Sequence, residues 1–130
     1  MGYQNIFRLI NEGLRLDNSI VRPIAAKTAA YSVTEDDFGT LFTNRGAAGS
    51  VTITLPAAAS YTGKSVEFYC IASQNIALTA AAGTIVTKNN AAATSATLST
   101  SGDQEGGSMI ATSDGTSWLI NSGDTTVTAS

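Results

Sequence analysis

Three consecutive acidic residues, Glu35, Asp36 and Asp37, are the part of the sequence whose residue types could do chemistry. Two carboxyl groups held across a cleft can cleave a glycosidic bond, and clustered carboxylates can bind calcium. Adjacent residues in a turn point in divergent directions, however, and the acidic residues elsewhere do not reproduce the spacing of a calcium loop. We therefore interpret the cluster as turn or helix-cap chemistry, with calcium binding and catalysis as the alternatives.

The rest of the chain offers little for a reactive site. Histidine is absent, which excludes Ser-His-Asp triads and imidazole metal ligands. Cys70 is the only cysteine, so the chain has neither an internal disulfide nor a zinc site, and its apolar neighbours indicate a buried thiol. The glycine loops at 46–49 and 106–107 match no phosphate-binding motif. We expect no enzyme activity, no catalytic residue, no cofactor and no metal.

The composition favours an all-β protein. Alanine, serine and threonine are abundant, whereas a helix bundle would need long Leu, Ile and Met stripes opposite Lys and Glu. Threonine and valine suit pleated surfaces, and glycine and asparagine suit the turns between strands. Charged residues are only 13% of the chain, about half the usual share of about 25%. So few charges suggest that much of the surface is hidden against copies of the same chain.

The charge is divided unevenly along the chain. Residues 1–27 hold four basic and two acidic side chains, whereas residues 28–130 hold three basic and eight acidic ones, and the net charge is −3. This acidic balance argues against nucleic acid as a partner, because such proteins carry a basic face. No basic n-region with an apolar h-region opens the chain, and no apolar run approaches the roughly 18 residues of a membrane span. We expect no membrane association and a cytosol-like compartment.

Residues 1–27 form a predicted N-terminal arm, a short helix or extended docking segment followed by a linker. Apolar residues from Ile6 to Leu14 recur at i, i+3, i+4 and i+8, one face of a helix, while the sequence from Leu14 onward fits a strand equally well. Such side chains would leave an adhesive patch on a lone monomer. We predict that they dock on a partner or a neighbouring subunit, with packing on the chain's own domain as the alternative. The predicted docking residues are Tyr3, Ile6, Phe7, Arg8, Leu9, Ile10 and Leu14.

Residues 28–122 form the predicted domain, and residues 123–130 a flexible C-terminal tail. Short segments with alternating or β-branched character are separated by turn residues every 8–12 positions or so, which is typical of a sandwich or barrel. The expected fold is therefore all-β, a single β-sandwich, jelly-roll-like or barrel domain. The expected strands are Ala30–Val33, Gly39–Thr43, Ser50–Leu55, Lys64–Ile71, Ile76–Thr79, Thr84–Thr87, Ala96–Ser99, Gly107–Thr112 and Ser117–Asn121.

Asp114-Gly115 predicts a hairpin between the last two of these strands, because a primed turn needs residues that tolerate a positive φ. Trp118 lies on the returning strand. We interpret it as a core or interface anchor, with a sugar-stacking platform as the alternative.

In order and spacing, these elements resemble a small β-module that recurs in structural proteins of tailed bacteriophages. The resemblance covers roughly residues 28–122. It is carried by Tyr31-x-Val33, Asp37-x-Gly39, Phe42-x-Asn44, Gly46-Ala47-x-Gly49, Val51-Thr-Ile-Thr-Leu55-Pro56, Gly63, Val66-x-Phe68, Gly83-x-Ile85 and Asp114-Gly-Thr-x-Trp118.

The resemblance implies a virion component on the capsid surface, made in the host cytoplasm. That component would be a capsid decoration (cement) protein that binds the major capsid protein and reinforces the shell. It would be a homo-oligomer, with a trimer favoured. The alternative is a receptor- or glycan-binding fibre or tail module in which the loops and Trp118 face a host surface. The N-terminal arm contains no motif that resembles this family.

Overall fold

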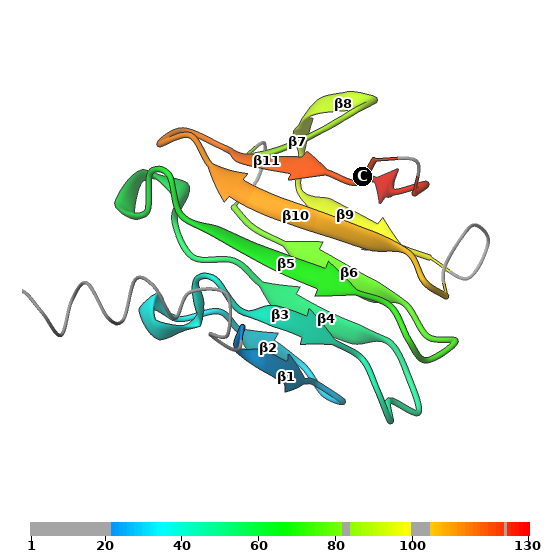
Figure 1. Cartoon of the computed structure of the whole chain (residues 1–130). Coiled ribbons are helices and arrows are strands. Elements are labelled where there is room, and N and C mark those ends of the chain that lie inside the picture. The colour runs from blue at the N-terminus through cyan, green and yellow to red at the C-terminus, as the bar shows by residue number, and fades with distance from the viewer. Residues whose placement is uncertain (1–21, 82–83, 100–104, 124) are drawn as a thin grey trace, which may run out of the picture.

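The computed structural model describes residues 22–81, 84–99, 105–123 and 125–130, and these residues form a two-layered all-β domain. The predicted fold class is confirmed. In Figure 1 the strands of a seven-stranded sheet lie over those of a five-stranded sheet. The strands are β1 (Ile24–Ala26), β2 (Tyr31–Ser32), β3 (Leu41–Thr43), β4 (Val51–Thr54), β5 (Ser65–Tyr69), β6 (Ile76–Thr79), β7 (Ile85–Thr87), β8 (Asn90–Ala93), β9 (Ser95–Leu98), β10 (Ser108–Ser113), β11 (Trp118–Asn121) and β12 (Thr128–Ala129).

The first half of the chain winds back and forth between the two sheets. The larger sheet has the order β1-β3-β5-β10-β11-β7-β8, and the smaller has the order β12-β9-β6-β4-β2. From β1 to β7, therefore, each strand enters the sheet opposite to that of its predecessor. Parallel neighbours result without crossover helices: β1, β3 and β5 run parallel in one sheet, and β2, β4 and β6 in the other.

The second half closes the sandwich with antiparallel strands. The hairpin β10–β11 lies between β5 and β7 and pairs antiparallel with β5. Strand β9 pairs antiparallel with β6, and β12 then pairs antiparallel with β9. Two one-turn 3₁₀ helices, η2 (Glu35–Asp37) and η3 (Ala58–Ser60), lie in the connections β2–β3 and β4–β5.

The core lies between the sheets and is built by period-2 alternation. In β4 the buried Val51 and Ile53 alternate with exposed threonines, and in β10 every second side chain is buried. Phe42 and Phe68 are paired across β3 and β5, with ring centroids 5.7 Å apart. Full burial of each large apolar side chain stabilises the fold by about 1.5–3 kcal/mol, so this layer dominates the folding free energy.

Three short strands lie where the sequence predicts none. Strand β1 lies within the predicted linker, and β12 lies within the predicted C-terminal tail. Strand β8 begins at Asn90, between two of the expected strands. All three have two to four residues and lack an apolar alternation, and each is an edge strand of its sheet. The C-terminal residues are also fixed by Ser130, whose carbonyl accepts hydrogen bonds from the Thr94 and Ser95 amides.

The hairpin predicted at Asp114-Gly115 is confirmed, but its turn differs from the expected primed type. Gly115 has φ +92°, whereas no non-glycine residue in the described part of the chain has a positive φ. The Asp114 carboxylate instead accepts hydrogen bonds from the amides of Thr116 and Ser117, at 2.9 and 2.7 Å. An Asx turn therefore closes the loop, and the glycine is needed at one position only.

The turns at one end of the sandwich are joined by the side chain of Asn44, which is fully buried. Its Oδ1 accepts hydrogen bonds from the Ile71 and Ala72 amides at 2.7 and 2.8 Å. Its Nδ2 donates to the carbonyls of Ala72 and Gln74 at 3.1 and 3.0 Å. One side chain thus satisfies four backbone groups of the β5–β6 connection and ties the β3–β4 turn to it.

We expect Asn44→Ala to lower the free energy of unfolding by about 3 kcal/mol, because buried polar groups without a partner cost about 1–3 kcal/mol each. Chemical denaturation at pH 7 measures this change. Asn89→Ala is the matched control: Asn89 is exposed, and its replacement is expected to change stability by less than about 0.5 kcal/mol. Equal denaturation midpoints for the two variants would contradict the role of Asn44.

Candidate functional site

The residues predicted as sites are not brought together in one place. The seven docking residues of the arm, Tyr3 to Leu14, lie outside the described residues. Trp118 is fully buried, and its indole Nε1 donates a 2.8 Å hydrogen bond to the carbonyl of Pro56. Its ring also stacks on Phe38, with centroids 6.1 Å apart. Trp118 is therefore a core anchor within the subunit, and it has no exposed ring surface on which a sugar could stack.

The acidic cluster forms a turn. Glu35, Asp36 and Asp37 make up η2, and the Asp37 carboxylate accepts hydrogen bonds from the Thr34 amide (2.8 Å), the Thr34 hydroxyl and the Tyr31 hydroxyl (2.6 Å). The interpretation as turn or cap chemistry is confirmed for Asp37. Partial burial alone would raise the pKa of Asp37, but the hydrogen bonds from Tyr31 and Thr34, with the nearby charge of Lys27, lower it instead.

Lys27 and Tyr31 complete this cluster. The Lys27 ammonium lies 3.6 Å from the centroid of the Tyr31 ring, a cation–π contact. The hydrogen bond to Asp37 raises the pKa of the Tyr31 hydroxyl, and burial and the negative charge of Asp37 add to that effect. The cluster connects β2 to the 3₁₀ turn before β3. The carboxylate of Asp37, the hydroxyl of Tyr31 and the ammonium of Lys27 all have partners within the cluster, so these three side chains hold the segments together.

Cys70 is buried, as its neighbours in the sequence predict. Burial raises the pKa of the Cys70 thiol, although hydrogen bonds from Asn44 and with Gln74 oppose that shift. Its Sγ lies 3.5 Å from the Asn44 amide nitrogen and 3.2 Å from the carbonyl of Ala72. A buried, protonated thiol is a poor nucleophile, so the position is structural.

Neither a metal-binding cluster nor a membrane-spanning helix is found in the described part of the chain. Across residues 22–81, 84–99, 105–123 and 125–130, no three acidic or cysteine side chains gather closely enough to hold a metal ion. In the same part of the chain, no helix has the length and apolar character needed to cross a bilayer.

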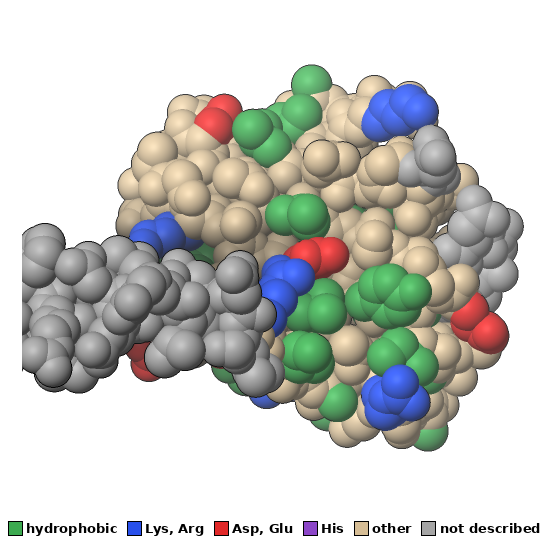
Figure 2. All heavy atoms as spheres, in the orientation of Figure 1, with side chains coloured by type: hydrophobic (Ala, Val, Ile, Leu, Met, Phe, Trp, Pro, Cys, Tyr) green, Lys and Arg blue, Asp and Glu red, His purple; other side chains and the backbone are tan. Residues whose placement is uncertain are grey.

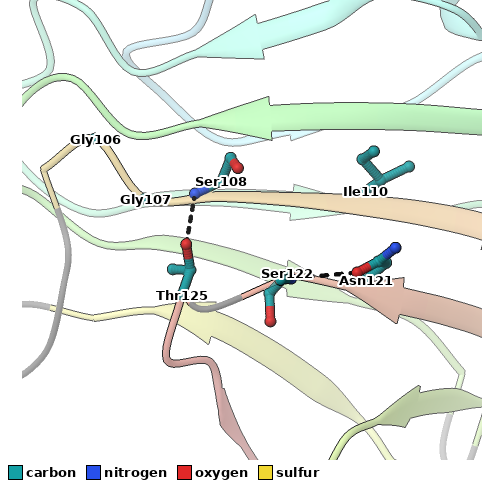
Figure 3. A pocket seen from close by; sticks show the side chains of 8 residues that line it. Gly106, Gly107, Ser108, Ile110, Asn121, Ser122 and Thr125 are labelled. Carbon is teal, nitrogen blue, oxygen red and sulfur yellow. Dashed lines mark hydrogen bonds between the residues drawn. The ribbon is translucent and has the colours of Figure 1, made fainter.

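A surface hollow lies beside the start of β10 and the end of β11, with a volume of about 410 Å³. Figure 3 shows its lining of small side chains, in which the Thr125 hydroxyl accepts a hydrogen bond from the Ser108 amide at 3.3 Å. The Asn121 side chain accepts another from the Gly123 amide. None of its lining residues is titratable; they are Gly106, Gly107, Ser108, Ile110, Asn121, Ser122, Gly123 and Thr125. The hollow could hold a neutral polar group but could not catalyse proton transfer.

The most distinctive surface is the outward side of the seven-stranded sheet, here called the apolar face. The strand register places Ile24, Leu41, Glu67, Ile110 and Asn121 in one row across five strands. Its large hydrophobic side chains include three that are exposed: Ile24 by 64%, and Tyr69 and Leu119 by 39% each. The residues of the apolar face are Ile24, Leu41, Tyr69, Val86, Ile110 and Leu119. Figure 2 shows hydrophobic side chains spread over this side of the molecule, with few charges between them.

The outward side of the five-stranded sheet, here called the threonine face, differs sharply. Thr52 and Thr54 of β4 are exposed, and the Thr54 and Thr79 hydroxyls are hydrogen-bonded at 3.3 Å. The residues of this face are Ser32, Thr52, Thr54, Ala77, Thr79 and Thr97. Side chains of this kind keep their contacts with water. The two outer faces are thus chemically unequal, and only the apolar face carries large hydrophobic side chains suited to a protein partner.

An ion pair crosses the apolar face near β1. The Arg22 guanidinium donates to the Glu67 carboxylate at 2.6 Å and to the carbonyl of Gly39 at 3.3 Å. Arg22 thereby reaches from the residue before Pro23, across β3, to β5. Because both side chains are partly exposed, the pair contributes little to stability. It does place Arg22, the first residue that the structure describes, beside the apolar face.

No protein-family model matches this chain, and neither a curated protein nor a solved structure matches it.

Sequence patterns miss the apolar face because both sides of these strands are partly hydrophobic. Met109 to Ala111 and Trp118 to Ile120 look like continuous apolar runs, which predict a buried strand without indicating which side is outward. One strand does indicate which side is outward. In β5, Ser65, Glu67 and Tyr69 alternate with buried residues, and β10 pairs with this strand.

We expect the Asp37 cluster to make stability depend on pH in the acidic range. The folded-state pKa of Asp37 is below its ordinary value, so its contribution is present above the pKa of the unfolded chain and is lost as pH falls through the folded pKa. Asp37→Asn should cost about 1 kcal/mol at pH 7, the usual effect of losing a cap, and much less near pH 2.5. Denaturant melts at both pH values measure the difference. Asp36→Asn is the control, since none of the hydrogen bonds found among the described residues involves the Asp36 side chain. A loss in Asp37→Asn that is the same at both pH values would contradict this assignment.

Proposed function

We infer that this protein is a non-enzymatic structural component of a phage virion. It binds the outer surface of the capsid as a decoration (cement) protein and reinforces the shell. The observation that carries the proposal is the apolar face, with Ile24, Tyr69 and Leu119 exposed on one side of a rigid sandwich whose other side is the threonine face. A protein that must lie flat on another protein needs one adhesive side and one side that tolerates water.

The energetics of a shell suit such a surface. A decoration protein meets the same lattice site many times, and contacts among linked copies turn a weak individual site into strong overall attachment. Scattered hydrophobic side chains of moderate exposure give a weak site without making the free protein insoluble. In this proposal the direct partner is the major capsid protein. The body is a homo-oligomer, with three copies favoured by the resemblance to phage modules.

The arm has a place in the same scheme. Arg22, the first residue that the structure describes, is held on the apolar face by Glu67 and Gly39. We propose that the predicted docking residues Tyr3 to Leu14 contact the same shell surface or a neighbouring subunit. The arm and the apolar face together form the proposed attachment surface.

A receptor- or glycan-binding fibre module is the second candidate, and the hollow beside Asn121 and Ser108 is the feature that favours it. The hydroxyl and amide groups in its lining could bind sugar hydroxyls. It is the weaker candidate because Trp118 is buried and supplies no aromatic platform.

The location of the protein in purified virions separates these candidates. For a decoration protein we expect gold-labelled antibody over the whole head, with copies on the order of hundreds per particle by quantitative mass spectrometry, because decoration follows the repeat of the lattice. Label confined to the tail tip, with a handful of copies, would overturn the proposal and favour the fibre module.

Charge placed on the apolar face should reduce binding to undecorated particles. We expect Tyr69→Glu combined with Leu119→Glu to lower particle occupancy at least tenfold, because a desolvated charge must be accommodated at the contact. Thr52→Glu, on the threonine face, is the matched control and should bind normally. Co-sedimentation with particles measures occupancy, and circular dichroism verifies folding. Equal occupancy for the double variant and the control would remove the apolar face from the attachment surface.

A further inference from the structure

Strand β1 ends the seven-stranded sheet with one side of its backbone open. The Leu41 amide donates to the carbonyl of Pro23, and the Lys27 amide donates to the carbonyl of Thr43. With the parallel register Ile24–Leu41 and Ala26–Thr43, these bonds direct the backbone groups of Ala25 toward β3. The amides and carbonyls of Ile24 and Ala26 therefore point away from the sheet. Among the described residues, nothing pairs with them.

Within the described residues, strand β1 itself carries none of the devices that usually prevent strand addition. Proteins protect an open edge with charged side chains, proline, a bulge or a covering loop. The β1 sequence Ile-Ala-Ala has no charge, and Ile24 is 64% exposed. The flanking cations are turned onto the chain's own body, Arg22 toward Glu67 and Lys27 over the Tyr31 ring.

The other open edges are less suited to pairing. In β8 the Ala92 amide already donates to the side chain of Asn90 at 2.9 Å, which occupies part of that edge. Strands β2 and β12, at the ends of the smaller sheet, have only two residues each. Figure 1 shows β1 and β2 side by side at one end of the sandwich, away from the C-terminus. Of the described edges, β1 therefore offers the longest row of free backbone groups.

We propose that β1 pairs antiparallel with β1 of a second copy of this chain, about a two-fold axis that passes beside Ala25. In this register Ile24 lies opposite Ala26 of the other copy, and Ala26 lies opposite its Ile24. Both are residues whose amide and carbonyl point outward, so each opposing pair exchanges two hydrogen bonds. The two Ala25 residues face each other as the non-hydrogen-bonded pair. The same strand is complementary to itself, as a two-fold contact requires.

The second copy is the partner that this edge specifies best. An antiparallel mate must present outward backbone groups at positions i and i+2 with small or apolar side chains, and β1 meets both conditions. The two copies also bring their exposed Ile24 side chains onto one continuous apolar surface. The pairing is compatible with a three-fold contact elsewhere on the body, because dihedral assemblies combine two-fold and three-fold axes. It does not depend on the proposed capsid attachment.

Cysteine cross-linking of the full chain tests the register. In a non-hydrogen-bonded antiparallel pair the Cα atoms are about 4.5 Å apart, within the range that a disulfide spans, whereas diagonal neighbours are about 7–8 Å apart. Ala25→Cys should therefore form a disulfide-linked dimer under mild oxidation. Ile24→Cys, although more exposed, is diagonal to its own copy and should cross-link at least tenfold more slowly. The wild type, whose only cysteine is the buried Cys70, is the blank. Equal rates for the two variants, or no dimer from Ala25→Cys, would overturn the proposal.

A second measurement requires no introduced thiol. Sedimentation equilibrium of the wild type should show mass doubling with increasing concentration, and hydrogen exchange at the Ile24 and Ala26 amides should slow in parallel. Ala26→Pro removes one outward amide that β3 does not use and should raise the dissociation constant at least tenfold. Ile24→Lys, a substitution at an exposed side chain, should do the same even if the proline variant folds poorly. Asn89→Lys is the control: Asn89 is exposed in the β7–β8 connection, at the other end of the seven-stranded sheet, and the variant should associate like the wild type. If neither Ala26→Pro nor Ile24→Lys weakens association, β1 is not the contact.

Discussion

The buried amide of Asn44 is the interaction on which the winding of this chain depends. A strand that alternates between two sheets must turn at the ends of the sandwich, and each turn carries amides and carbonyls that the sheets do not pair. Asn44 makes two acceptor bonds and two donor bonds to the connection between β5 and β6, one winding further along the chain. Its position at the end of β3 fixes how the β3–β4 turn lies on its neighbour. A hydrophobic residue of similar size would fill the space but leave those backbone groups without partners.

The opposite end of the sandwich is closed by residues of the β10–β11 hairpin. The Ser113 hydroxyl donates to the carbonyl of Ala58 at 2.6 Å, and the Trp118 indole donates to that of Pro56. Both acceptors lie in the β4–β5 connection, which the winding places at that end. The hairpin therefore also fixes the position of the β4–β5 connection. These strands lie far along the sequence from the turns that they hold in place. Such non-local contacts cost loop-closure entropy before their interactions can stabilise the fold.

Local patterns in the sequence predict the long strands well because their information is local. Alternation in β4 and β10 and the turn at Asp114-Gly115 identify elements without knowledge of their partners. Strands β1, β8 and β12 escape prediction because two to four small or polar residues become strands only by pairing with a neighbour. The role of Asn44 escapes for a similar reason, since Asn44-Arg45-Gly46 predicts a turn, and only the packed turn of the next winding shows what the Asn44 amide binds. Of the candidate site, the sequence indicates an adhesive arm but not the apolar face, which depends on which side of each strand is outward.

The same winding also explains why the body has one adhesive side. Parallel strands stacked in register place equivalent positions in rows, so a hydrophobic residue at one outward position extends a row that its neighbour has begun, as with Ile24 and Leu41. A low content of charged residues then leaves few side chains to interrupt that row, and the Arg22–Glu67 pair is neutralised within it. An open edge at β1 and an apolar face on the same sheet are therefore two results of one constraint. A sheet built by successive windings has a first strand with an open edge. That edge can be paired only with a segment or a partner that is not part of the winding.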